Sequence, residues 1–488
     1  MWQNFFKTAF RNLGKHKSFS AINIAGLTLG LTACLLIGLF VRDEKQYDTF
    51  IPDGDRVFRV YNEYTNSEGT DNRAPAPPMF ATTLKKEFPE VEQTARVLML
   101  QETKTLFEVG AKKLYEQSGY FVDSTFFNVF PLPFVSGSPA KALDDPKSIV
   151  LSQDMANRLF GSVDPVGKQV LMNKTPLQVT GVFKAAPKFH LQFHYMLPLS
   201  AAGLPQERME SWGWQQFYNY VKVKKGANVK ALETKFQKLV QQETDRFNKD
   251  GSKSLNVPHL QPLRKIHLYS ASFKMDAAIR GNSVYVTALT LIAIFILLIA
   301  CFNFINLATA KSLQRAKEVG VRKSIGASRN QLLYQFIGET TLLAYISHFI
   351  AVILTFLLLP TLNNFTDKQI SVAVFSSPLL LIFLLLLAFV VGVLAGFYPA
   401  LVLSRFQPVK VLKGSVVTDA APGKTPWLRH TLVVVQFALS VLLIISALVV
   451  FQQVSYLHHK DLGFSKEQIL FFPMRGDSLF KNNEAFKN

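Results

Sequence analysis

The segment ATAKSLQRAKEVGVRKSIGAS, Ala308–Ser328, follows almost directly on the apolar run VYVTALTLIAIFILLIACF at 284–302. That run is long enough to cross the hydrocarbon core of a bilayer, which needs about 20 apolar residues of helix. The segment after it is cationic, glycine-containing and helical in pattern, and a second apolar run soon follows. A short basic connector between two apolar runs indicates a membrane protein.

The whole chain has the composition of a membrane protein. Of its 488 residues 49% are hydrophobic, and 42 are phenylalanine. Five segments are long, apolar and free of charge at their centres, where one charge would cost about 2.5–3.5 kcal/mol. We predict five membrane-spanning helices, at 19–41, 284–310, 336–361, 377–401 and 431–453.

The positive charge of the chain predicts its orientation. The segments 1–18, 311–335 and 402–430 carry net charges of +4, +5 and +4, out of +19 in total. Five spans place all three on one side, and short basic loops face the cytoplasm. We therefore expect a multi-pass protein of the bacterial cytoplasmic (inner) membrane with a cytoplasmic N-terminus. Because topology explains most of the charge, nucleic-acid binding is not expected.

The segments between the spans define the remaining regions. Residues 42–283 mix strand-like stretches such as VFRVYNEY with helix-like ones such as PPMFATTLKKEFPEV, which predicts a large, two-lobed α+β extracytoplasmic domain. The other expected regions are an amphipathic N-terminal helix at 1–18, or an extension of the first span, and an outside loop at 362–376. The linker at 402–430 is cytoplasmic, and 454–488 begins a second outside domain, as if the chain were truncated.

The polar region shows few signs of catalytic chemistry. Its His190 and His194 have ligand-like spacing, but an ordinary histidine pair is the better interpretation because no acidic or cysteine partner is evident nearby. Cys34 and Cys301 lie in apolar runs, which excludes a disulfide framework. We expect neither an enzyme nor a bound cofactor or metal in this chain.

The connector at 311–335 carries local signals of its own. Gly326 fits a left-handed helix cap, and Ser328 with Gln331 fits a capping box that starts the next helix. A surface helix anchored among lipid phosphates would explain the cations. It would not explain the apolar residues interleaved with them, which favour a docking element for another protein.

Four motifs in order resemble the FtsX-like, MacB-type ABC transporter permease family. RAKEVGVRKSIGAS is similar to its cytoplasmic signature, and FQPVKVLKG (Phe406–Gly414) to the end of its fourth span. SIVLSQDMANRLFGSVDPVGKQV with LQVTGVF resembles its periplasmic core domain, and FRNLGKHKSFSAINIAGLTLG its N-terminal start. The fifth span fits duplicated eight-span members.

The resemblance implies a permease subunit that couples ATP hydrolysis in a separate cytoplasmic ATPase to motion of the outside domain, that is, mechanotransmission. ATP and Mg would be used by that partner. A second permease copy or half, membrane lipid and a periplasmic adaptor are further implied partners. A membrane-anchored sensor or a scaffold for an extracytoplasmic partner is the alternative. The candidate ATPase-coupling residues are Arg315, Lys317, Glu318, Val319, Gly320, Arg322, Lys323 and Gly326.

Overall fold

The computed structural model describes residues 17–66, 69–100, 104–247, 255–314, 316–404 and 427–460. They form two compact units. The membrane unit comprises the described residues of Met1–Asp43 and Val284–Gln468, and the sheet unit comprises those of Glu44–Ser283. The predicted N-terminal helix at 1–18, the linker at 402–430 and the segment at 454–488 fall mostly outside the described residues.

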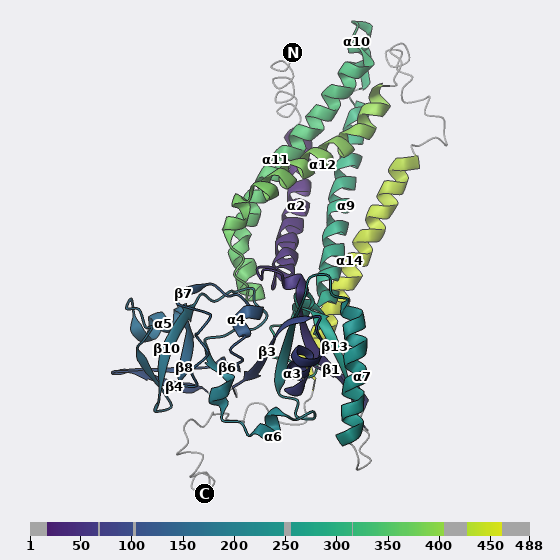
Figure 1. Ribbon diagram of the computed structural model, residues 1–488. Coiled ribbons are helices and arrows are strands. Elements are labelled where there is room, and N and C mark those ends of the chain that lie inside the picture. Colours follow the sequence, from purple (N-terminus) through teal and green to yellow (C-terminus); the bar gives the residue numbers. More distant parts are fainter. Residues whose placement is uncertain are drawn as a thin grey trace. The chain divides into compact units, whose positions relative to one another are not determined.

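The membrane unit contains five helices long and apolar enough to cross a bilayer, which confirms the predicted helical membrane protein. Such runs become helices in lipid because a helix satisfies its own backbone hydrogen bonds. The short α10 (Ala316–Ser324) and the 3-10 helix η4 (Val372–Ser376) lie between them in the chain. The five long helices (Figure 1) are α2 (Lys17–Lys45), α9 (Ser283–Gln314), α11 (Arg329–Thr366), α12 (Pro378–Ser404) and α14 (Trp427–His459).

Small residues bring four of these helices close together. A Cβ built on Gly30 of α2 would lie only 2.6 Å from the Cβ of Ala300 in α9. The hydroxyl of Thr340 in α11 donates to the backbone oxygen of Gly392 in α12 at 3.0 Å. Small residues and interhelical hydrogen bonds are the usual means of packing in lipid. The shared core consists of Leu27, Leu31, Ala300, Phe304, Leu343, Ala344, Ala351, Val391 and Ala395.

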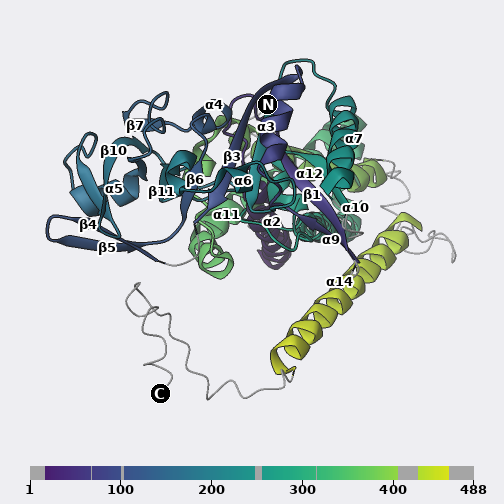
Figure 2. The same ribbon diagram turned by 60° about the horizontal axis from the view of Figure 1, so that its bottom comes forward.

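The fifth long helix, α14, packs far less closely. The side chains of its residues 430–459 are exposed or half-buried, and it lies at the edge of the other helices (Figure 2). The Asn306 amide on α9 donates to Gln436 Oε1 on α14 at 3.4 Å. Polar side chains of two spans thus pair across helices, as expected in an apolar medium.

The sheet unit is built on one mixed sheet of thirteen described strands. The order is β13-β1-β12-β3-β6-β11-β8-β10-β9-β4-β5, with β2 paired to β1 and β7 to β10. Helices and strands in one unit confirm the predicted α+β class. The strands are β1 (Val57–Asn66), β2 (Gly69–Arg73), β3 (Val91–Met99), β4 (Thr105–Val109), β5 (Lys112–Glu116), β6 (Gly119–Val122), β7 (Phe134–Gly137), β8 (Ser148–Ser152), β9 (Gln169–Met172), β10 (Thr175–Phe183), β11 (Tyr195–Pro198), β12 (Phe217–Val223) and β13 (Leu255–Pro262).

Helices cover the two ends of this sheet separately, as Figures 1 and 2 show. At one end α5 packs Met155 and Leu159 on β8 and β10, and at the other α3 and α7 pack on β1, β12 and β13. Ser152 caps α5 by accepting the N–H of Met155 at 3.3 Å. The helices are η1 (Gly54–Arg56), α3 (Met79–Glu87), α4 (Phe126–Val129), α5 (Gln153–Phe160), η2 (Leu199–Ala202), α6 (Gln206–Met209), α7 (Val229–Phe247), η3 (Leu263–Lys265) and α8 (Ile266–Tyr269).

Candidate functional site

The segment between α9 and α11 is a short helix with a defined end. After α10 ends at Ser324, Gly326 adopts a φ of +100°, which residues with a Cβ rarely adopt. The N–H of Ala327 donates to Arg322 O at 3.0 Å, and the N–H of Gly326 donates to Lys323 O at 3.1 Å. These two bonds form a Schellman motif. The predicted left-handed cap at Gly326 is therefore confirmed.

The next helix, α11, has an equally defined start. The N–H of Gln331 donates to Ser328 Oγ at 3.3 Å, and the N–H of Ser328 donates to Gln331 Oε1 at 3.0 Å. This reciprocal pair is the predicted capping box. We name residues 316–328 the α10 connector. Local hydrogen bonds thus fix the turn between α10 and α11 on both sides.

One side of α10 is buried against α11. Val319 is 1% exposed and packs with Leu332 and Phe336, while Leu333 and Ile337 border the same cluster. Gly320 is buried as well. Val319 therefore attaches α10 to the membrane unit and presents no surface to a partner.

Polar side chains continue this attachment. Arg322 pairs with Glu318 at 2.7 Å and also donates to Gln335 Oε1 at 2.9 Å. Gln335 in turn donates to Glu339 Oε1 at 3.1 Å, one helical turn further along α11. The partly exposed ion pair alone stabilises the protein by less than about 1 kcal/mol. The series of contacts does more, because it fixes the direction of the Arg322 side chain.

The opposite side of α10 is exposed and partly apolar. Val321 is 45% exposed and Ile325 is 81% exposed. At 3.6 residues per turn, these two residues fall within about 100° of Glu318 and Arg322 around the helix axis. We name Glu318, Val321, Arg322 and Ile325 the docking face, after the role that the sequence predicts for this segment. Two exposed β-branched residues beside a charged pair form a compact surface of the kind that protein partners bury.

The eight predicted coupling residues thus divide into groups. Glu318 and Arg322 lie on the docking face, whereas Val319, Gly320 and Gly326 build the connector. The backbone of Lys317 belongs to α10, and Arg315 lies outside the described residues. Burial, together with the neighbouring Arg329, lowers the pKa of Lys323.

The sequence prediction counted Val321 and Ile325, together with Val319, among the apolar residues that favour a docking element, but it did not include them in the eight candidates. Their spacing of four residues was the available signal, because residues at i and i+4 share one helix face. The sequence alone did not show which apolar residues of α10 face outward.

A second polar cluster lies within the sheet unit, beside the residues that follow α2 and precede α9. His267 Nε2 lies 3.1 Å from Glu44 Oε2, and its Nδ1 lies 2.7 Å from Ile279 O. Both partners carry acceptor oxygens, so each lies where a ring N–H can donate to it. The Tyr47 ring stacks on this imidazole at 3.5 Å. One histidine therefore joins the end of α2 to the segment before α9.

His190 makes a parallel connection. Its Nδ1 lies 2.9 Å from Asp48 Oδ1 and its Nε2 lies 2.8 Å from the Tyr220 hydroxyl, while its backbone oxygen accepts the N–H of Ile279 at 2.8 Å. Burial raises the pKa of Tyr220 well above its usual value, so the phenol stays protonated and can donate to Nε2. His194, the other member of the predicted pair, contacts Glu116 instead. We name His190 and His267 with their partners the histidine junction.

Two family models match this chain. The MacB-like periplasmic core domain matches residues 20–239, and the FtsX-like permease C-terminal domain matches residues 290–408. The first match covers most of α2 and of the sheet unit. The second extends from α9 to the end of α12 and includes the α10 connector.

The chain is also similar to known proteins. YvrN of Bacillus subtilis, an uncharacterized ABC transporter permease, is 22% identical over 431 residues, or 83% of this chain and 98% of the relative. The macrolide export ATP-binding/permease protein MacB of Neisseria meningitidis is 24% identical over 297 residues, 60% of this chain but only 43% of the relative. A crystal structure of a domain of a permease protein from Porphyromonas gingivalis is 21% identical and covers 44% of this chain and 92% of that one, with a TM-score of 0.39. From the family models and the relatives together, the chain belongs to the FtsX-like, MacB-type ABC transporter permeases.

Proposed function

We propose that this chain couples a separate cytoplasmic ATPase to its sheet unit, and that the ATPase binds the docking face of α10. The observation that carries the proposal is the exposure of Val321 on a short helix outside the apolar spans and of Ile325 directly after that helix. Exposed apolar side chains on a rigid element form good contacts at low entropic cost. The charged neighbours Glu318 and Arg322 would give the contact its register.

Motion of the ATPase would reach the spans through contacts already described. Val319 packs on α11, and Arg322 bonds to Gln335 of the same helix. A push on α10 therefore moves α11 with it, because packed interfaces shift as bodies. In the chain, α9 precedes α10 and follows the segment that holds the histidine junction. A displacement of α10 would therefore move α9, and the histidine junction would transmit this movement to the sheet unit.

The proposal assigns the chemistry to the partner. ATP and Mg²⁺ would be bound by the cytoplasmic ATPase. This chain would bind the ATPase and transmit its motion to the sheet unit. The basic charge of 311–335 supports a cytoplasmic docking face and thus a place in the inner membrane. A second permease copy or half, and a periplasmic adaptor, would complete the transporter.

The test is co-purification of an ATPase with the full chain from native membranes in mild detergent. A hot-spot residue contributes about 2 kcal/mol or more to an interface. The double variant Val321→Asp, Ile325→Asp should therefore lower ATPase recovery by more than tenfold. Asn330→Asp is the control, since it adds a charge at an exposed position in the first turn of α11, off the docking face.

Equal ATPase recovery with the double variant and with Asn330→Asp would refute this docking site. An eluate of wild-type protein that holds a signalling protein and no ATPase would instead favour a membrane-anchored sensor. An eluate that holds only an extracytoplasmic hydrolase would favour a scaffold.

A further inference from the structure

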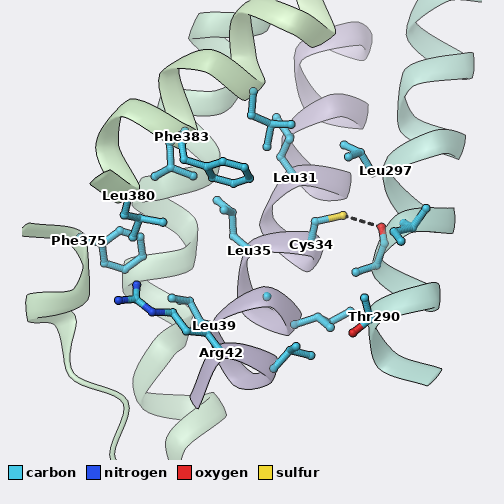
Figure 3. A pocket seen from close by; sticks show the side chains of 17 residues that line it. Leu31, Cys34, Leu35, Leu39, Arg42, Thr290, Leu297, Phe375, Leu380 and Phe383 are labelled. Carbon is cyan, nitrogen blue, oxygen red and sulfur yellow. Dashed lines mark hydrogen bonds between the residues drawn. The ribbon is translucent and has the colours of Figure 1, made fainter. Parts of the chain in front are cut away.

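A cavity of about 390 Å³ lies in the membrane unit among α2, α9 and α12 (Figure 3). Its volume falls within the range of ligand sites, about 300–1,000 Å³. The wall is mostly leucine, isoleucine and phenylalanine, with Leu35 of α2, Leu297 of α9 and Phe383 of α12 on its three sides. The spans therefore border a half-open site for an apolar group.

The polar side chains of the wall, Arg42 excepted, already have partners. The Cys34 thiol donates to Ala293 O at 3.0 Å, and the Thr290 hydroxyl donates to Val286 O at 2.7 Å. Water in this space would find few hydrogen-bond partners, and apolar cavities of this kind stay dry. A hydrocarbon chain fits the wall better than water or a polar solute.

A glycine of α2 borders this space. Glycines in spans usually allow two helices to approach closely, as Gly30 does with Ala300. Gly38 lies on the same helix two turns later, yet a Cβ built there would meet no described atom within 4 Å. The surface of α2 at Gly38 is therefore available to an occupant that is not one of the described helices.

One cation stands at the end of the cavity. Arg42 is exposed, lies beside Phe375 in Figure 3, and makes no ion pair with any described residue. It ends the apolar stretch of α2 and is followed by Asp43, Glu44 and Lys45, which mark the level of the membrane–water interface. A guanidinium at this level has the geometry to bind a phosphate through two N–H groups.

We propose that the cavity binds one phospholipid from the leaflet at the C-terminal end of α2. One acyl chain lies along Gly38 and Leu35 between α9 and α12, and the lipid phosphate accepts hydrogen bonds from Arg42. The lipid then acts as a packing element among the three helices. This assignment does not depend on the ATPase docking site, because no residue of the cavity belongs to α10.

The test measures phospholipid retained by the full chain in native mass spectrometry, after reconstitution in nanodiscs of palmitoyl-oleoyl phosphatidylethanolamine and phosphatidylglycerol in equal parts. Wild type should carry one tightly bound phospholipid per chain. Gly38→Leu, which fills the open space, should abolish it, and Arg42→Gln should lower occupancy on the order of tenfold, the loss of one charge-assisted contact. Leu379→Phe is the control, because it enlarges an exposed residue of α12 next to the wall.

A second measurement uses wild-type protein only, so its result does not depend on whether a variant folds. A phosphatidylethanolamine with a photoreactive diazirine in its acyl chain should label peptides of α2, α9 and α12 well above those of α14. Labelling spread evenly over all five spans would overturn the proposal. So would equal lipid retention by Gly38→Leu and Leu379→Phe, or lipid-free dimers in which α2 crosslinks to a second copy of the chain.

Discussion

Replacing Val319 with alanine should release α10 from α11 while the five spans stay folded. Val319 is almost fully buried in a small local cluster with Leu332 and Phe336. The change deletes two methyl groups, each contributing about 0.8 kcal/mol through burial. With a modest term for the space left behind, the attachment of α10 should weaken by about 2 kcal/mol.

Hydrogen exchange of the α10 amides measures this attachment directly. Local opening exposes the amides of one element without unfolding the rest. A loss of 2 kcal/mol should accelerate exchange in α10 by about 30-fold, since 1.4 kcal/mol corresponds to a factor of ten. The measurement uses the full chain in detergent, with peptides of α10 resolved by mass spectrometry.

The same helix supplies the control. Val321→Ala makes the same chemical change at a residue that faces away from α11 and is 45% exposed. Exposed substitutions usually alter stability by less than about 0.5 kcal/mol, which here means a change in exchange of about twofold. Equal acceleration by the two variants, or none by Val319→Ala, would refute the burial argument.

Three further predictions concern other parts of the chain. His267→Phe keeps an aromatic ring but removes the hydrogen bond to the buried Glu44, so the free energy of unfolding should fall by about 1.5–3 kcal/mol and the melting temperature with it. An unchanged melting temperature would contradict the role of the histidine junction. His348→Leu should raise the free energy of unfolding by about 1–3 kcal/mol, and with it the melting temperature, because neither buried ring nitrogen has a hydrogen-bond partner among the described residues. The pKa of Glu116 is lowered because hydrogen bonds from His194, Gln117 and Arg158 outweigh its burial. Stability from this carboxylate is present above its ordinary pKa and is lost as pH falls through the lowered value, so Glu116→Gln should flatten the acid side of a melting-temperature profile below its ordinary pKa of 4.5.

Local features of the α10 connector could be predicted from sequence because local bonds create them. The left-handed cap at Gly326 and the capping box of Ser328 and Gln331 each involve residues within a few positions of one another. The inward and outward sides of α10 could not be assigned in this way. Val319 and Val321 are the same residue type, and only the position of Leu332 and Phe336 in the folded protein decides which valine is buried.

The histidine junction was beyond sequence reasoning for a different reason. Its partners are far apart in the chain: His267 and Glu44 differ by 223 positions, and His190 and Asp48 by 142. The sequence prediction found the apolar spans and the strand β1 because each is signalled by neighbouring residues of one kind. It took His190 for an ordinary member of a histidine pair because nothing near it in sequence indicates Asp48 or Tyr220.

The strand order of the sheet unit has a consequence during synthesis on the ribosome. β1 is made early, yet it is flanked by β12 and β13, the last of the described strands to be translated. Until Leu255–Pro262 emerge, one edge of β1 keeps free N–H and C=O groups, which are templates for aggregation. The nascent sheet unit therefore stays prone to edge-to-edge association until β13 is made, just before α9.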